Sequence, residues 1–140
     1  MTTYKRKAYY HETDQMGIIH HANYLKWMEE ARVDFMDQMG FSYFKMEELG
    51  VISPVLGINV EYKSSVRFDD NIVIYVKILE YNGVRMTIGY EIYNSDSTIL
   101  HAKAESKHCF MKDNKIVSLK KALPEFHQRF EDMRCTDLSI

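Results

Sequence analysis

Several residue types and patterns that define large protein classes are missing from this sequence. The chain has only two cysteines in 140 residues, Cys109 and Cys135, and they form no CxxC pair. Neither a zinc site nor a disulfide framework is therefore indicated. Neither a GxSxG nucleophile elbow nor a phosphate-binding P-loop occurs, which argues against the hydrolases that depend on those motifs.

Strong net charge and long apolar runs are absent as well. A formal net charge of −2 gives the chain no general attraction to nucleic acid. No run approaches the length that spans a membrane, and the N-terminus lacks the apolar stretch of a signal peptide. Because two unpaired cysteines also suit a reducing compartment, we expect a soluble, cytoplasmic protein with no membrane insertion.

The chain does contain enough apolar residues for a core. They make up 46% of the sequence, and aromatic residues make up 13%, which excludes a disordered or fibrous chain. The sequence has two prolines and neither an internal repeat nor a low-complexity linker. We therefore expect a single domain over residues 1–140.

The first half of the chain is predicted to hold one short strand and two helices. Residues 4–10 alternate as a strand does, and a loop follows. From about Ala22 to Met39 the apolar spacing changes to three and four residues, which is typical of a helix, and Gly40 is its stop signal. A shorter helix is predicted over residues 43–49. The positions that we expect on the apolar side of the long helix are Leu25, Met28, Arg32, Phe35, Met36 and Met39.

The second half alternates with a period of two, as half-buried antiparallel strands do. Asn82-Gly83 between two such runs is a strong hairpin signal, and Pro124 is expected to open a last helix that ends near Met133. The strands must bury their apolar face, and the long helix is the only element large enough. The predicted fold class is therefore α+β, with a curved antiparallel sheet wrapped around a central long helix. Such a sheet leaves an edge strand open, which a two-fold dimer would cover.

The segment with the most chemical information is residues 9–32, YYHETDQMGIIHHANYLKWMEEAR. Asp14 lies on a loop that leads into a helix N-terminus near His21, where free backbone N–H groups favour negative charge. A thioester hydrolase needs a carboxylate that attacks or activates water, beside donors for the developing oxyanion. The same position also suits an ordinary cap or turn residue. His20 and His21 have no third ligand at a recognisable spacing, so neither a metal site nor a cofactor is predicted.

This segment resembles the signature of the 4-hydroxybenzoyl-CoA thioesterase family, in its YbgC-like acyl-CoA thioesterase branch. The matching residues are Tyr10, Thr13-Asp14, Gly17-Ile18-Ile19, His21-Ala22-Asn23-Tyr24, Glu29, Ala31 and Arg32. The resemblance implies the hotdog fold and an enzyme that hydrolyses an acyl-CoA thioester to a free acid and CoA. It implies that Asp14 is the catalytic aspartate, as nucleophile or general base, and that the His21 backbone N–H polarises the thioester carbonyl. It also implies that Tyr10 belongs to the active-site surroundings, positioning Asp14 or serving as a core residue.

The chain departs from the family pattern at two positions. His20 stands where the family often has an aromatic residue, a change that affects the expected pocket wall. Asp69 stands where the turn between strands often has glycine. Because Asp tolerates positive φ better than most residues, we expect that turn to persist.

Two other functions on the same fold stay open. A hydratase would need an HFxGxP-like run, which is absent, whereas a non-catalytic acyl-CoA or acyl-carrier binding protein would keep the fold without turnover. The resemblance further implies a homodimer or homotetramer whose active sites draw on two subunits. For an acyl-CoA substrate, the candidate contacts to the phosphates are the basic residues Lys63, Arg67, Arg85, Lys103 and Lys107.

Overall fold

The computed structural model describes residues 1–138, with side chains described as far as Arg134. In chain order the elements are β1 (Thr2–Lys7), the 3₁₀ turn η1 (Tyr10–Glu12), α1 (Asn23–Gln38), α2 (Tyr43–Glu48), β2 (Val55–Tyr62), β3 (Asn71–Tyr81), β4 (Arg85–Asn94), β5 (Leu100–Cys109), β6 (Met111–Lys112), β7 (Lys115–Ile116), α3 (Leu119–Ala122) and α4 (Pro124–Leu138). Within the described residues, no helix is long and apolar enough to cross a membrane. Cys109 is a buried free thiol, and the side chain of Cys135 lies outside the described part.

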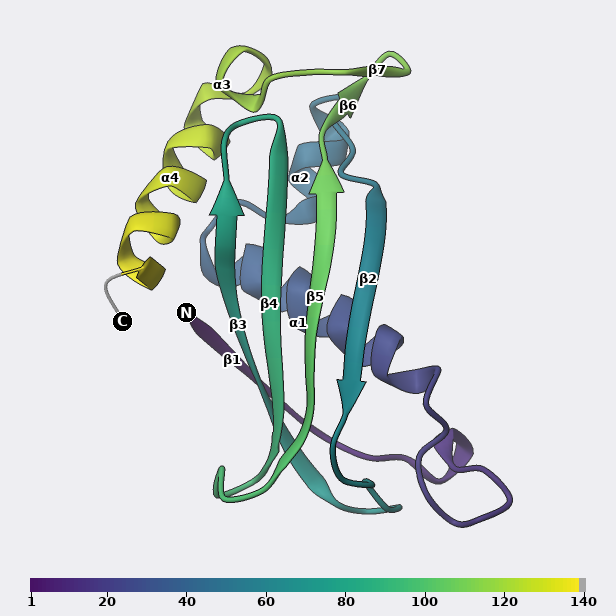
Figure 1. Ribbon diagram of the computed structural model, residues 1–140. Coiled ribbons are helices and arrows are strands. Elements are labelled where there is room, and N and C mark those ends of the chain that lie inside the picture. Colours follow the sequence, from purple (N-terminus) through teal and green to yellow (C-terminus); the bar gives the residue numbers. More distant parts are fainter. Residues whose placement is uncertain (139–140) are drawn as a thin grey trace.

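Five strands form one antiparallel sheet in the order β1-β3-β4-β5-β2. The long helix α1 lies against one face of this sheet and crosses it, while α4 packs alongside β3 (Figure 1). The short strands β6 and β7 form a separate hairpin. A curved antiparallel sheet around one long helix is the predicted α+β hotdog arrangement, which is confirmed.

The buried side of α1 follows from its spacing of three and four residues. Tyr24, Met28 and Phe35 are at most 3% exposed, and they join the core that also includes the inward residues of β3, β4 and β5. Leu25 was expected on this side, but that prediction is wrong because Leu25 is 40% exposed. It lies one residue, or about 100° of helical turn, beyond Tyr24 and so points away from the sheet. The last helical residue is Gln38 and Met39 is the C-cap, and the predicted stop residue Gly40 follows with φ of +86°.

Two element boundaries differ from the prediction. The first strand ends at Lys7 rather than residue 10, because the backbone N–H of Tyr9 donates to the carboxylate of Glu12 at 2.8 Å and the chain turns there. The last helix continues to Leu138, beyond the predicted end near Met133, since no glycine or proline interrupts it. The four-residue helix α3 was not predicted, because one turn is too short to show a period.

Two predicted turns, at Asn82-Gly83 and at Asp69, are confirmed. Asn82 Oδ1 accepts hydrogen bonds from the backbone N–H groups of Val84 and Arg85 at 2.9 and 2.8 Å, and Gly83 adopts φ of +90° between β3 and β4. Asp69, in the turn before β3, adopts φ of +72°. An aspartate therefore occupies the left-handed conformation that glycine would otherwise provide.

A chain of polar side chains crosses the core between α1 and the sheet. Arg32 Nη1 donates to the Tyr90 hydroxyl at 3.1 Å. The Tyr90 hydroxyl lies 2.7 Å from Ser106 Oγ, which lies 2.7 Å from His108 Nε2. Ser106 and His108 are completely buried and Arg32 is 8% exposed. Burial, with a smaller contribution from the Arg32 charge, lowers the pKa of His108 from 6.5 to about 4, so its ring is neutral at pH 7.

The strand β2 forms an open edge of the sheet. It pairs only with β5, and its other side has no strand partner within the described residues. Four of its apolar side chains are 42–55% exposed: Val55, Leu56, Ile58 and Tyr62. Unpaired backbone groups next to exposed apolar side chains make β2 a surface on which another strand can pair.

Candidate active site

Asp14 begins a tight loop between η1 and α1. Its backbone N–H donates to the Ile18 carbonyl at 2.8 Å, and its carbonyl accepts from Gly17 at 3.2 Å. Asp14 Oδ1 accepts from the Met16 backbone N–H at 2.8 Å. Gly17 closes the loop with φ of +78°, which side chains with a Cβ rarely adopt. These bonds hold one carboxylate oxygen, and in the described part of the chain no hydrogen bond or ion pair reaches the other, Oδ2.

The backbone at the start of α1 leaves one donor unused. The N–H of Ala22 donates to His20 Nδ1 at 3.2 Å, and those of Asn23 and Tyr24 donate to the carbonyls of His20 and His21 at 3.0 and 3.2 Å. Among the hydrogen bonds of residues 1–138, none uses the N–H of His21. The residue that was predicted to polarise a carbonyl is thus the one in this turn whose N–H is available to a ligand.

Asp14 and His21 line one cavity of about 270 Å³. Tyr62, at the end of β2, donates its hydroxyl to the His21 carbonyl at 3.1 Å and holds the strand end against the helix start. Burial raises the pKa of Tyr24 to about 12, so its hydroxyl is protonated at neutral pH. The full lining is Asp14, Ile18, Ile19, His21, Tyr24, Tyr62, Lys63, Ser64 and Ser65. The residue with the unbonded carboxylate oxygen and the residue with the unused N–H therefore line the same cavity.

Tyr10 lies elsewhere. Its side chain is 75% exposed and its ring contacts the Phe68 ring edge-on, with centroids 5.4 Å apart. It is not part of the cavity lining, and no hydrogen bond joins its hydroxyl to Asp14 within the described residues. Within one chain, then, the structure brings together two of the three predicted site residues, Asp14 and His21, and leaves Tyr10 apart.

The histidines of this region stack rather than converge. The rings of His20 and His21 lie with centroids 4.4 Å apart, and His20 does not contribute to the cavity lining. In the residues that the structure describes, no group of three or more His, Cys, Asp or Glu side chains is placed to hold a metal ion. The polar groups of the residues that line this cavity are the Asp14 carboxylate, the His21 backbone N–H and imidazole, two tyrosine hydroxyls, the Lys63 ammonium and two serine hydroxyls.

The residues of the cavity that the sequence pattern did not indicate come from the end of β2. Tyr62, Lys63, Ser64 and Ser65 lie more than 40 residues from Asp14 in the chain. The pairing of β2 with β5 and the bridge between Ile18 and Arg67 bring this segment next to the loop, and the hydrogen bond from Tyr62 to the His21 carbonyl joins the two. Lys63 had been named as a possible phosphate contact, but its charge alone did not distinguish it from four other basic residues.

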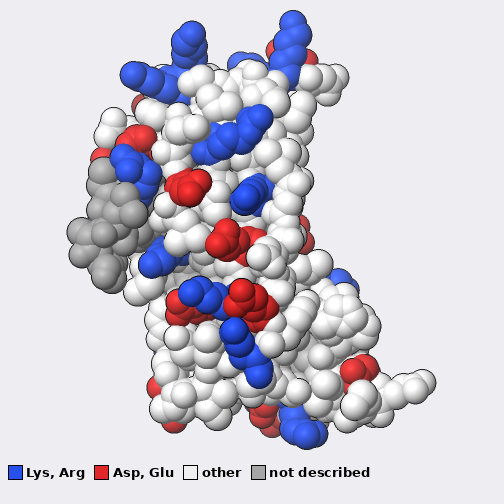
Figure 2. All heavy atoms as spheres, in the orientation of Figure 1, with Lys and Arg blue, Asp and Glu red and all other residues white. Residues whose placement is uncertain are grey.

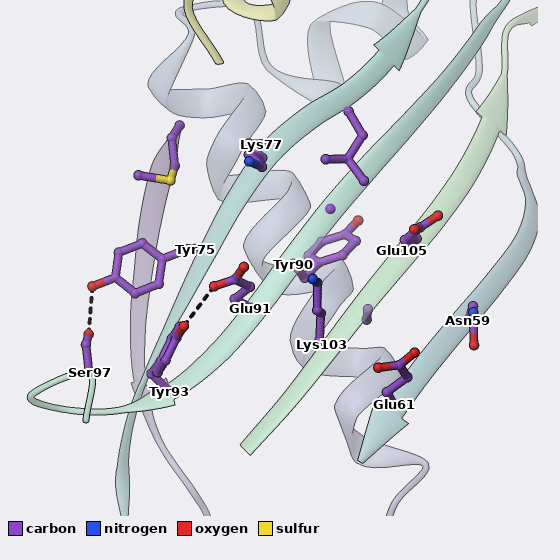
Figure 3. A pocket seen from close by; sticks show the side chains of 14 residues that line it. Asn59, Glu61, Tyr75, Lys77, Tyr90, Glu91, Tyr93, Ser97, Lys103 and Glu105 are labelled. Carbon is purple, nitrogen blue, oxygen red and sulfur yellow. Dashed lines mark hydrogen bonds between the residues drawn. The ribbon is translucent and has the colours of Figure 1, made fainter. Parts of the chain in front are cut away.

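The outer face of the sheet, away from α1, holds a larger hollow of about 490 Å³. Four of its polar side chains are engaged with one another: the Tyr75 hydroxyl lies 2.7 Å from Ser97 Oγ, and the Tyr93 hydroxyl donates to Glu91 at 2.9 Å (Figure 3). Figure 2 shows that basic and acidic side chains are interspersed over this face. Such a mixture is typical of a solvated surface, and no helix start adjoins it. The cavity at Asp14 is therefore the better candidate site.

Comparisons with known proteins agree on one family. A family profile described as the thioesterase-like superfamily matches residues 10–130. The candidate acyl-CoA thioesterase YneP of Bacillus subtilis is 44% identical over 124 residues, which cover 87% of this chain and 89% of that protein. The acyl-CoA thioester hydrolase YbgC of Escherichia coli is 30% identical over 95 residues, covering 68% and 71%. The crystal structure of a DHNA-CoA thioesterase from Staphylococcus aureus superimposes with a TM-score of 0.92 and 31% identity, covering 99% of this chain and 93% of that one.

Proposed function

Because the chain belongs to the thioesterase-like superfamily, we propose that it is an acyl-CoA thioesterase that hydrolyses an acyl-CoA to a free acid and CoA. The observation that carries this proposal is that Asp14, with one unbonded carboxylate oxygen, and His21, with an unused N–H, line one cavity. Thioester hydrolysis needs a negatively charged oxygen near the carbonyl carbon and a donor near the carbonyl oxygen. Both groups are present there without a metal or a cofactor in the proposed chemistry.

In the proposed reaction the thioester carbonyl accepts a hydrogen bond from the His21 N–H. The partial positive charge of the α1 N-terminus adds to the stabilisation of the oxyanion that develops on this oxygen. Asp14 Oδ2 then attacks the carbonyl carbon, or removes a proton from a water that attacks it, while the Met16 N–H holds Oδ1. CoA leaves as the thiolate and takes up a proton. In the first route the acyl group stays on Asp14 as a mixed anhydride, which a water molecule then hydrolyses to the free acid and the restored carboxylate. In the second route the attacking water supplies the new oxygen of the acid directly. Both routes therefore consume one water and give a free acid and CoA.

We further propose that the active protein is a homodimer or homotetramer in which the open edge of β2 is covered. Tyr62 and Lys63 join the end of this strand to the cavity, so a second copy paired along β2 would lie next to the site. Because the ring of Tyr10 is exposed, it is free to contact the active site of a second subunit in such an assembly. We propose Tyr10 as an active-site residue on that basis. In this proposal the ligand of each site is an acyl-CoA substrate.

The test of the proposed function is Asp14→Asn, which keeps the size of the side chain and removes its charge. We expect kcat for acyl-CoA hydrolysis to fall by about a hundredfold or more, the usual effect of losing a general base. The KM and the thermal midpoint should change little, since the amide oxygen can still accept from Met16. The measurement is release of free thiol from a panel of acyl-CoAs, with thermal unfolding on the same preparation.

Two other results of this experiment would contradict the proposed mechanism or function. A cap residue without a catalytic role would lose up to roughly 1 kcal/mol of stability and keep its turnover. A fully active Asp14→Asn protein would therefore contradict the proposed mechanism. A wild-type protein that binds acyl-CoAs and releases no thiol from any of them would instead be the binding protein that was left open above.

A further inference from the structure

The loop that carries Asp14 and His21 is held at both ends by one residue, Glu12. Glu12 is 4% exposed although its side chain is charged. Its backbone carbonyl accepts from the His20 N–H at 2.9 Å and from Asn23 Nδ2 at 2.8 Å. Glu12, two positions before Asp14, thus binds His20, which directly precedes His21, and Asn23, the first residue of α1.

The carboxylate of Glu12 adds three more bonds. Oε1 accepts from Arg6 Nη2 in β1 and from the Tyr9 backbone N–H, each at 2.8 Å. Oε2 accepts from Trp27 Nε1 in α1, also at 2.8 Å. A buried carboxylate with three donors is a rigid anchor, because moving it would leave charged or polar groups without partners. Through these bonds Glu12 connects β1, η1 and α1 to the loop.

The rest of the loop depends on this anchor. Thr13 and Ile19 face each other in an isolated antiparallel bridge, and the Ile19 N–H donates to Val66 at 2.8 Å. Residues 14–17 then form local turn bonds, and Ile18 pairs with Arg67 in a second isolated bridge. The loop that carries Asp14 and His21 is thus attached to Val66 and Arg67 along one side and to Glu12 at its base.

We propose that Glu12 is a positioning residue for the reaction, setting the distance between the Asp14 carboxylate and the His21 N–H without touching the substrate. This inference rests on the proposed function. Reaction rates respond steeply to such a distance, since a misplacement of about 1 Å can cost on the order of a hundredfold in rate. We expect substrate binding, and with it KM, to depend on this distance much less.

The chain offers a matched control for this proposal in Glu30. Arg6 Nη1 donates to both carboxylate oxygens of Glu30 at 2.9 Å, so Glu12 and Glu30 share the same guanidinium. Glu30 also accepts from the Tyr4 hydroxyl at 2.9 Å, but within the described residues it forms no hydrogen bond or ion pair with the loop. Glu12→Gln and Glu30→Gln each remove one negative charge from Arg6, and only the first loosens the loop.

The experiment compares kcat, KM and thermal midpoint for Glu12→Gln and Glu30→Gln. We expect Glu12→Gln to lower kcat by about tenfold or more while KM stays within about twofold, and Glu30→Gln to leave kcat within about twofold. Asn23→Ala, which removes only the amide bond to the Glu12 carbonyl, provides a second variant if Glu12→Gln does not fold. It should also lower kcat more than KM rises.

A double mutant separates positioning from general stability. If Glu12 acts through Asp14, adding Glu12→Gln to Asp14→Asn should cost no further rate, because the misplaced group is already inactive. Full kcat in Glu12→Gln, or in Asn23→Ala where Glu12→Gln does not fold, would overturn the inference, and so would an independent, multiplicative loss in the double mutant. If Asp14→Asn alone were fully active, the proposed function would fail, whereas an inactive Asp14→Asn beside a fully active Glu12→Gln would sink only the present inference.

Discussion

Lys63 is the only lysine or arginine among the residues that line the cavity at Asp14. Its Nζ lies 3.2 Å from Glu61 Oε2, and both side chains are about half exposed, 49% and 58%. An exposed pair of this kind contributes little and is readily exchanged for another anion. Lys63 is therefore the first of the five basic residues to test for contact with a phosphate of CoA.

At this residue we expect Lys63→Ala to raise KM for acyl-CoA about threefold to fivefold and to leave kcat unchanged. The effect should shrink as salt is added, because screening weakens an exposed charge pair. Lys103→Ala, on the outer face of the sheet, is the matched control and should have no effect. The same acyl group carried on pantetheine, which lacks the nucleotide phosphates, should not distinguish Lys63→Ala from wild type. If it does, Lys63 acts on some other part of the substrate.

His108 makes the stability of the protein depend on pH. Its pKa is lowered to about 4 in the folded protein from 6.5 in an exposed histidine, so the unfolded chain binds its proton first as the pH falls. The contribution of His108 is therefore complete above pH 6.5 and is lost between pH 6.5 and 4, up to about 3 kcal/mol. Denaturant unfolding at several pH values should show a smaller loss in His108→Asn than in wild type. The exposed His11→Asn should behave like wild type, and an equal pH slope in all three would contradict the assignment.

At the scale of elements, prediction from the sequence worked where the pattern is local and long. The period of α1 extends over 16 residues, and the Asn82-Gly83 turn satisfies its own hydrogen bonds through the Asn82 side chain. Both were predicted correctly for that reason. The end of β1 was not, because it depends on the Glu12 carboxylate, whose partners Arg6 and Trp27 come from two other elements.

The candidate site also has a part that the local sequence predicts and a part that depends on packing. Asp14 and His21 are seven residues apart on one loop, so their proximity is visible in the sequence. The other wall of the cavity, Tyr62 to Ser65, is brought there by strand pairing across the sheet. Sequence spacing carries no information on that contact, and it could not have selected Lys63. The position of Tyr10 relative to a site likewise depends on packing beyond its own segment.

For the whole molecule, the open edge of β2 predicts assembly. We expect wild-type protein to be a dimer or tetramer by light scattering at micromolar concentration. Ile58→Lys places a charge among the exposed apolar side chains of β2 and should shift the protein toward monomers with at least about a tenfold loss of activity. Ile99→Lys is the control, since Ile99 is 48% exposed but lies outside β2. An active wild-type monomer, or a fully active monomeric Ile58→Lys, would contradict the proposed assembly.

The polar chain from Arg32 to His108 also limits how the sheet can be assembled. A slip of β5 by one residue against β4 would turn Ser106 and His108 to the outer face, because successive side chains of a strand point to opposite faces. Either Glu105 or Lys107 would then enter the packed space under α1, and the Tyr90 hydroxyl would lose its Ser106 partner. Apolar residues tolerate several alignments, whereas this buried hydrogen-bonded series fits one. The sequence thus penalises misaligned hairpins during folding and selects a single strand register, in addition to stabilising the finished core.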